Sequence, residues 1–343
     1  MSHAADVINA VLKGRLVPFL GAGVNLCGRD PKYRWSGPGD WLPSGYELAS
    51  YLADTLGYRR PDGCKELHCP SVQCTAQDCP SQELLRACTH VEADLDLARV
   101  SQSCATRLGP GRLYDELQNV FDYQYPVTEV HRFLASLAFA APQARLASAR
   151  HLLIVSTNYD DLMERAFRDR NQAFDLVFYD PETPDPGGFR RGCFLHQKPG
   201  ADPKVIERAN EYDYPFLEQQ PVILKIHGTS GRPVVITEDH YIDYLADEAF
   251  AKLPKRLLTR LCNSHLLFLG YSLRDWNFRV FLRRIKRNST QDFTSWAVVK
   301  NIDDEEPAFW QARARVEILS RDLGDYVREI GSELAGRPER PSA

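Results

Sequence analysis

The chain has 343 residues, of which 43% are hydrophobic and 26% are charged, and its formal net charge is -4. This length suits one large α/β domain or two modest ones. Because the net charge is slightly negative and neither half is strongly basic, a surface that binds a nucleic-acid duplex directly is excluded from our expectations.

The N-terminal stretch MSHAADVINAVLKG is short and amphipathic. It lacks the charged start, apolar middle and small-residue cleavage site of a signal peptide. No apolar run in the sequence approaches the roughly 18 residues that are needed to cross a bilayer. We therefore expect a soluble, cytoplasmic protein that does not enter a membrane.

Short apolar runs recur along the chain, with helix-like stretches between them. Several runs are continuously apolar rather than alternating, which is typical of strands buried on both faces of a parallel sheet. The pattern predicts an α/β fold, a Rossmann-like doubly wound parallel sheet with a helical insertion. The expected strands are RLVPFL (15–20), HLLIVSTN (151–158), FDLVFYD (174–180), PVILKIHG (221–228), PVVITED (233–239), SHLLFLGYS (264–272), TSWAVVKN (294–301) and RVEILS (315–320). The clearest helices between them are DDLMERAFRDR (160–170), DHYIDYLADEAFAKLPKRLLTRLCN (239–263) and RDWNFRVFLRRIKR (274–287).

Residues 45–150 differ in character from the rest of the chain. Apolar residues recur there at steps of three and four and strand signals are absent, which predicts a helical insertion between the first two strands. The segment 180–214 is rich in Pro, Gly and charge and predicts long loops. We therefore divide the chain into the start of a Rossmann-like domain (1–44), a helical insertion with a Cys-rich loop (45–150), the remainder of the Rossmann-like domain (151–335) and a disordered tail (336–343).

The first predicted strand breaks abruptly into Gly21-Ala22-Gly23. Glycines at the start of a helix let the backbone approach a phosphate, which the helix N-terminus attracts. The full G-x-G-x-x-G pattern is not met, because its third position is Leu26. A tight turn without a ligand therefore stays open as the alternative.

Three later strands also end in small or hydrogen-bonding residues. Asn158 and Asp160 follow the second strand, His227 follows a fourth, and Gly270 and Ser272 follow a sixth. A histidine at such a place can act as a general base near neutral pH. Helix capping or a histidine in an ordinary turn would explain each feature separately. Together they would supply one sheet edge with the phosphate cradle, ribose partners and chemical group that a dinucleotide requires.

The segments FLGAGVN, STNYD, KIHG and LGYSL, in this order and at these intervals, resemble the motifs of the sirtuin superfamily. AVVKN, which ends at Asn301, is similar to the late strand of that family, and RDLGDYVREIGSEL is similar to its closing acidic turn and helix. The resemblance implies a Rossmann sheet that binds NAD and cleaves its nicotinamide–ribose bond.

Within that superfamily, protein deacylases carry a zinc ribbon with two Cys-x-x-Cys pairs after the catalytic histidine. No such pairs follow His227. The segments WLPSGYELASYL, GRPVVITEDHYIDYL and LGYSLRDWNFRVFL instead resemble the bacterial antiphage-defence branch, whose members are NAD hydrolases. The glycine motif departs from the family at Asn25, where Ser is usual.

This resemblance implies an enzyme, an NAD+ glycohydrolase (NADase) that releases nicotinamide and ADP-ribose and depletes NAD in abortive infection. A constitutively active NADase would kill its host, so we expect control by assembly into a homo-oligomer or by an activating partner. In this branch, such partners include a HerA-type ATPase and an Argonaute-type protein.

The same resemblance assigns roles to residues of the matched motifs. The backbone of Gly21, Ala22 and Gly23 would hold the pyrophosphate of NAD. Asn158 would hold the attacking water or the nicotinamide-side ribose, and His227 would be the general base. The other residues assigned to NAD binding are Asn25, Thr157, Asp160 at the nicotinamide end, Gly270 and Ser272 along the ribose–phosphate path, and Asn301 at the adenosine side.

Nine cysteines are present, an odd number that argues against a disulfide framework. Cys64, Cys69, Cys74 and Cys79 recur every five residues, with His68 beside them. Such a cluster predicts a structural zinc ion that braces the insertion. Reduced thiols in a loop, or cysteines packed as small apolar side chains, are the alternatives.

Two other functions stay open on the sequence. One is a protein deacylase or ADP-ribosyltransferase, which the missing zinc ribbon disfavours. The other is a catalytically silent nucleotide-binding sensor. Asn158 and His227 argue against the silent sensor, because binding alone requires no general base.

Overall fold

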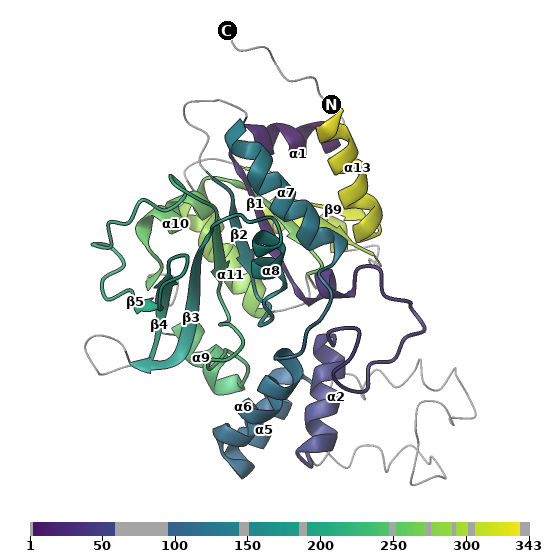
Figure 1. Ribbon diagram of the computed structural model, residues 1–343, viewed down its shortest axis with the longest axis vertical. Helices are drawn as coiled ribbons and strands as arrows, with labels where there is room; N and C mark the ends of the chain where they lie inside the picture. The colour runs from purple at the N-terminus through teal and green to yellow at the C-terminus, as the bar shows by residue number, and fades with distance from the viewer. Residues whose placement is uncertain are drawn as a thin grey trace.

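The computed structural model describes residues 3–58, 95–143, 151–184, 191–246, 252–271, 276–289, 293–300 and 306–336. These residues form one nine-stranded sheet with helices on both faces (Figure 1). The strand order is β5-β4-β3-β6-β2-β1-β7-β8-β9. The strands are β1 (Leu16–Leu20), β2 (Leu153–Ser156), β3 (Asp175–Pro184), β4 (Arg191–Gln197), β5 (Lys204–Val205), β6 (Val222–Lys225), β7 (His265–Leu269), β8 (Ser295–Val299) and β9 (Val316–Ser320).

The sheet is parallel from β3 to β9, and the edge strands β4 and β5 are each antiparallel to their neighbour. The central strand β1 pairs with β2 on one side and with β7 on the other. Strands β2 to β6 thus lie on one side of β1, and the chain then crosses to the other side of β1, where it forms β7, β8 and β9. This reversal beside β1 is a topological switch point, where open α/β sheets bind their ligands. The predicted α/β, Rossmann-like doubly wound fold is confirmed.

Two hydrophobic layers enclose the sheet. In β1, Val17 and Phe19 belong to one layer while Leu16 and Leu20 belong to the other, and all four are at most 1% exposed. Burial on both faces explains why this strand is continuously apolar. The first layer is completed by helices α10 (Lys255–Cys262), α11 (Trp276–Asn288) and α12 (Glu306–Ala314), and the second by α1 (His3–Leu12), α7 (Glu129–Gln143), α8 (Leu162–Arg168) and α13 (Leu323–Ala335).

A third core lies beyond the carboxyl edge of the central strands. It unites α2 (Gly45–Thr55), α5 (Leu97–Leu108) and α6 (Pro110–Phe121), which group together at the lower end of Figure 1. Tyr159 and Ile236, from loops that follow β2 and β6, insert into this core. Within the predicted insertion, α7 is the exception, because it packs on the sheet rather than on these three helices. The helices of the third core are therefore anchored to the same loops that carry the predicted site residues.

The predicted strand PVVITED is wrong, since residues 233–237 form no strand and α9 (Glu238–Ala246) begins at Glu238. Its apolar run has another cause. Val234 and Ile236 pack into the third core, while Val235 packs into the first sheet layer. The segment is apolar because it runs between two cores, and periodicity alone does not distinguish that situation from a buried strand.

Two further expectations need correction. The region 180–214, predicted as long loops, contains the end of β3 and the strands β4 and β5. In β4, Phe194 faces one layer and Cys193 and Leu195 face the other, so the strand is buried on both faces. The single helix expected over 239–263 is two helices, α9 and α10, and the second begins after Pro254.

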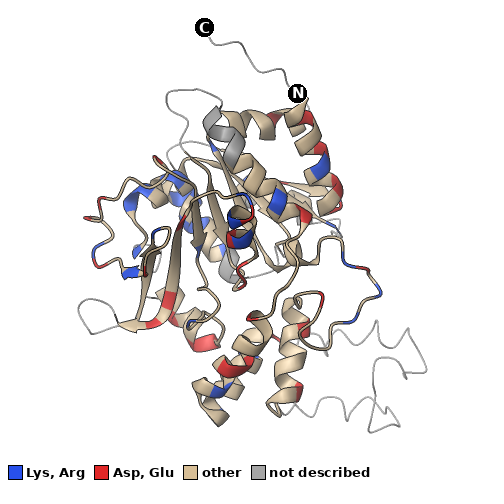
Figure 2. Cartoon of the chain, in the orientation of Figure 1, with Lys and Arg blue, Asp and Glu red and all other residues tan. Residues whose placement is uncertain are grey.

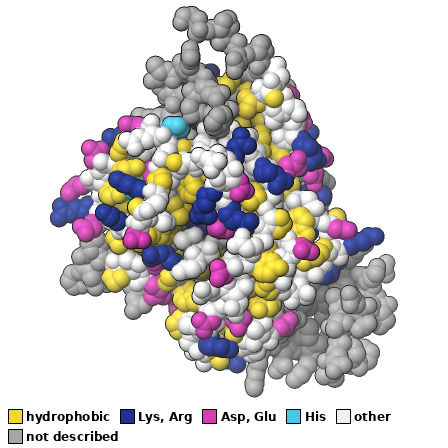
Figure 3. Space-filling model, viewed as in Figure 1, with side chains coloured by type: hydrophobic (Ala, Val, Ile, Leu, Met, Phe, Trp, Pro, Cys, Tyr) yellow, Lys and Arg dark blue, Asp and Glu magenta, His cyan; other side chains and the backbone are white. Residues whose placement is uncertain are grey.

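Acidic and basic side chains occur on many helices and loops (Figure 2), while the sequences of α10 and α11 contain basic residues and no acidic ones. On the face shown in Figure 3, basic and acidic side chains alternate with apolar ones. No helix within the described ranges has both the length and the apolar character that crossing a membrane requires.

Candidate functional site

The predicted NAD-site residues that the structure describes follow the carboxyl ends of four neighbouring strands, β6, β2, β1 and β7. Leu20 at the end of β1 pairs with Ser156 of β2 and Leu269 of β7, and Ser156 pairs with Lys225 of β6. The residues that follow these strand ends therefore emerge in one row along the sheet edge. Parallel pairing thus brings Gly21, Asn158, His227 and Gly270 to one edge, although they are spread over 250 residues of sequence.

The two glycines of the first turn pack against a third glycine. An added Cβ atom on Gly21 or on Gly23 would lie 2.7 Å from the carbonyl oxygen of Gly270. Gly270 has a φ of +63°, and its own Cβ would lie 2.2 Å from the backbone nitrogen of Val24. The Gly23 N–H donates to the Gly270 carbonyl at 2.8 Å. The glycines therefore allow the turns after β1 and β7 to touch backbone to backbone, a packing requirement that the sequence alone did not reveal.

The turn after β2 is attached to the glycine turn by its side chains. Asn158 is 8% exposed, and its Nδ2 donates to the carbonyl oxygen of Gly21 at 3.2 Å. Thr157 donates from its backbone N–H and its Oγ1 to the carbonyl oxygen of Leu20. Within the described part of the chain, no hydrogen bond engages Oδ1 of Asn158, so this acceptor is available for a ligand or a water molecule.

Asn25 and Asp160 form a buried pair beneath these turns. Nδ2 of Asn25 donates to Oδ2 of Asp160 at 2.7 Å, and the two residues are 5% and 6% exposed. The other carboxylate oxygen of Asp160 accepts the backbone N–H of Leu162 at the start of α8. Oδ1 of Asn25 is buried without a hydrogen-bond partner among the described residues. Asn25, which stands where the resembled family usually has Ser, is thus hydrogen-bonded to Asp160, the residue assigned to the nicotinamide end.

His227 follows β6 and is 6% exposed. Its ring contacts Tyr241 and Tyr244 of α9 edge-on, with centroid distances of 5.4 and 5.8 Å. The backbone carbonyl oxygen of His227 accepts the N–H of Val235 at 2.9 Å. This hydrogen bond closes the loop between the two residues. Two tyrosine rings of α9 therefore pack against the imidazole.

Sequence reasoning missed Lys225, a charged residue inside the buried strand β6. Lys225 is 1% exposed, and its Nζ lies 3.0 Å from Oε1 of Glu164 on α8, which is 2% exposed. Burial raises the pKa of Glu164, and the Lys225 ammonium opposes that rise. The signal was present in VILKIHG, because a lysine in an otherwise apolar strand requires a buried partner.

Sequence reasoning also missed Thr128 and His131, which bring α7 to the glycine turn. Oγ1 of Thr128 donates to the carbonyl oxygen of Val24 at 3.1 Å and lies 2.8 Å from Nδ1 of His131. Because the hydroxyl proton is used by Val24, Nδ1 of His131 carries the proton of their bond. Burial lowers the pKa of His131 to about 4, although Asp160 opposes this shift. His131 is therefore neutral at physiological pH.

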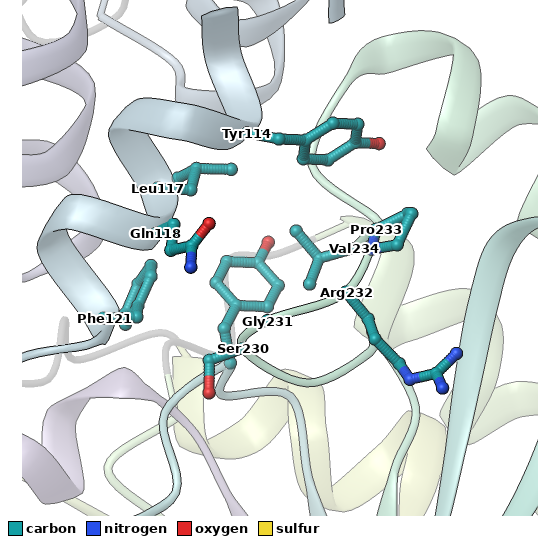
Figure 4. A pocket seen from close by; sticks show the side chains of 10 residues that line it. Tyr114, Leu117, Gln118, Phe121, Ser230, Gly231, Arg232, Pro233 and Val234 are labelled. Atoms are coloured by element: carbon teal, nitrogen blue, oxygen red, sulfur yellow. The ribbon is translucent and has the colours of Figure 1, made fainter. Parts of the chain in front are cut away.

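A cavity of about 160 Å³ lies beside this edge, between α6 and the loop that follows His227. Leu117 and Phe121 line it from α6, and Pro233 and Val234 line it from the opposite side (Figure 4). Tyr159, the residue after Asn158, also lines this cavity, and its hydroxyl donates to the carbonyl oxygen of Val235. Such a volume is smaller than an ordinary small-molecule pocket of roughly 300–1,000 Å³.

Several predicted site residues lie outside the described residues. They are Ser272, Asn301 and the cysteines proposed to bind zinc, Cys64, Cys69, Cys74 and Cys79. Within the ranges that the structure describes, no group of three or more His, Cys, Asp or Glu side chains could hold a metal ion. The four cysteines described there, Cys27, Cys104, Cys193 and Cys262, are free thiols.

A doubly wound sheet with polar residues gathered at its switch point defines a protein of the Rossmann-like, ligand-binding class. Comparison with known proteins indicates which Rossmann-like family this chain resembles. Residues 152–318 match the family model of the SIR2-like domain. A stretch of 145 residues, 41% of this chain, is 21% identical to Defense-associated sirtuin 2 of Bacillus subtilis, and it covers 11% of that protein's length. Residues 152–318 are therefore similar to the SIR2-like domain, in agreement with the sirtuin-like motifs of the sequence.

Proposed function

We propose that the protein is an NAD+ glycohydrolase that cleaves the nicotinamide–ribose bond and releases nicotinamide and ADP-ribose. The observation that carries this proposal is that Asn158, His227 and the glycine turn lie at adjacent strand ends, and that Asn158 and His227 fall within the residues that match the SIR2-like domain. A binding module would need the switch point and the glycines, but it would not need a histidine beside an amide at that place.

The chemistry follows from the leaving group. The nicotinamide ring of NAD carries a positive charge, so it leaves with the electron pair of the glycosidic bond and becomes neutral. The ribose carbon becomes oxocarbenium-like, and a water oxygen forms the new bond to it. His227 takes the proton from that water or from a ribose hydroxyl, and Oδ1 of Asn158 orients the same group.

The remaining residues bind and orient NAD in this proposal. The backbone of Gly21, Ala22 and Gly23 lies along the pyrophosphate, and Thr157, Gly270 and Ser272 line the ribose–phosphate path. Asn25 and Asp160 fix the nicotinamide end, and the adenosine-side role of Asn301 rests on the sequence resemblance alone. Ala22 is exposed at the start of the short 3-10 helix Ala22–Leu26, which supports this assignment because its surface is open to a ligand.

We further propose that NAD depletion serves antiphage defence. The similarity to Defense-associated sirtuin 2 supports this role. Because uncontrolled NAD depletion would kill the host cell, activity is expected to require self-assembly or a partner, such as a HerA-type ATPase or an Argonaute-type protein.

The decisive experiment is chromatography of NAD incubated with the purified protein, alone and with the products of neighbouring genes. Nicotinamide and ADP-ribose in equal amounts, without modification of an added acetylated peptide, would support the glycohydrolase. Transfer of an acyl group or of ADP-ribose to a protein would replace it with the deacylase or transferase function. Tight NAD binding without any product would favour a silent sensor.

A further inference from the structure

We propose that Lys225 is a positioning residue, whose buried ammonium group holds the Asn158 loop and the His227 turn in a fixed relation to each other. This inference deepens the proposed function, and it rests on that function for its kinetic consequences. Lys225 itself does not touch NAD, because its side chain is 1% exposed at the end of β6.

The contacts of Nζ join three separate pieces of the site. Nζ donates to the carbonyl oxygens of Tyr159 at 3.1 Å and Asp160 at 2.5 Å, which are the two residues directly after Asn158. It also donates to Oγ1 of Thr229, two residues after His227, at 3.1 Å. The fourth contact is the ion pair with Glu164 on α8.

These contacts use the whole donor capacity of the group. An ammonium has three N–H donors, and four oxygen acceptors lie within 3.1 Å of Nζ. No donor is therefore left for a ligand. The group acts as the centre of a junction between the turn after β2, the turn after β6 and the first turns of α8.

The geometry explains why a charge is buried here at all. Two successive carbonyl oxygens, those of Tyr159 and Asp160, accept from Nζ at one place. An apolar side chain there would remove the lysine donor from both, and the Tyr159 carbonyl would keep only the backbone N–H of Ser230, at 2.7 Å. A buried ion pair is by itself weak evidence for stabilisation of a fold. The loop contacts supply a further reason, since one ammonium group donates to both carbonyl oxygens and to Oγ1 of Thr229.

Three variants separate positioning from simple stabilisation. Lys225→Met removes the ammonium at similar length but leaves Glu164 buried without a partner. Glu164→Gln keeps Lys225 and its contacts to the loop carbonyls, and it is the matched control. Lys225→Met combined with Glu164→Met removes both charges. If the two charges serve only to neutralise each other, this double variant regains the stability that Lys225→Met loses.

The first readout is amide hydrogen exchange of each variant without NAD, followed over 157–162 and 227–230. We expect faster exchange in both segments for Lys225→Met and for the double variant, and near wild-type exchange for Glu164→Gln. The second readout is the rate of NAD cleavage under the conditions that activate the wild type. We expect kcat to fall roughly tenfold or more in both Lys225 variants, with KM changed much less, because small misplacements of reacting groups cost rate.

Recovery of wild-type kcat and wild-type exchange by the double variant would overturn the inference, because the ion pair would then serve stability alone. Equal losses in Lys225→Met and Glu164→Gln would overturn it as well. If Lys225→Met does not fold, the double variant and Glu164→Gln still decide the comparison. If the wild type cleaves no NAD, the proposed function fails while the exchange pattern still tests the role of Lys225.

Discussion

Asn25 and Asp160 are joined by a hydrogen bond of 2.7 Å, although 135 residues separate them in the chain. Asn25 belongs to the 3-10 helix after β1, and Asp160 belongs to the turn between β2 and α8. Asp160 is buried, so its carboxylate depends on such donors for its stability. The bond therefore couples the glycine turn to the Asn158 loop at the switch point.

Asn25→Ala would remove the donor to Asp160 and destabilise the protein by about 1–3 kcal/mol. Asn25→Asp would place a second carboxylate against the first and destabilise it more at pH 7–8. Because protonation of one carboxylate relieves this repulsion, the gap between Asn25→Asp and the wild type would shrink as the pH falls toward 5. Urea unfolding at a series of pH values measures both effects. A gap that stays constant with pH would show that the two side chains do not face each other.

His227→Ala and Asn158→Ala would each abolish NAD cleavage without unfolding the protein. For the histidine, the loss of general-base catalysis predicts a fall in kcat of about 10²–10⁴-fold. His151→Ala is the matched control, since His151 precedes β2 at the opposite edge of the sheet. Circular dichroism would verify folding, and chromatography would measure nicotinamide release. Full activity in either site variant would refute the role assigned to that residue.

Gly270→Ala would destabilise the protein by about 2 kcal/mol or more, because the new Cβ would meet the backbone of Val24 at a positive φ. Gly111→Ala is its control, since Gly111 lies in α6 with nothing within 4 Å of an added Cβ. This control would leave stability unchanged or raise it slightly, as alanine is the better helix former. Thermal unfolding of the two variants measures the difference. Equal midpoints would mean that the turns after β1 and β7 do not touch.

The free energy of unfolding would fall as the pH is lowered from about 6.5 to about 4, because the buried His131 resists protonation in the folded protein. Its folded pKa of about 4 lies below the ordinary value of 6.5, so the unfolded chain binds the proton more tightly in this window. The contribution is fully present above pH 6.5, is lost as the pH passes through 4, and amounts to about 3 kcal/mol. Denaturant unfolding across this range would show a steeper loss for the wild type than for His131→Asn. Parallel pH profiles for the two proteins would contradict the assignment of a buried neutral histidine.

The fold class was predictable because continuous apolar runs and intervening helices follow from burial of a sheet on both faces. The same reasoning failed for 233–237, where the apolar run connects two cores, and for β4, whose surroundings are rich in Pro, Gly and charge. In each case the local pattern was ambiguous, and contacts with residues far away in the sequence decided the structure.

By itself, the sequence determined the parallel sheet, the strand ends at which Gly21, Asn158, His227 and Gly270 lie, and the sirtuin-like motifs that connect them. Only the tertiary structure decided that the glycines pack against each other, that Asn25 bonds to Asp160 and that Lys225 joins two loops from inside the protein. The physical reason is that hydrophobic periodicity is local and can be read along the chain. Close backbone contacts and buried hydrogen bonds depend instead on which strand ends become neighbours, and that is fixed when the sheet assembles.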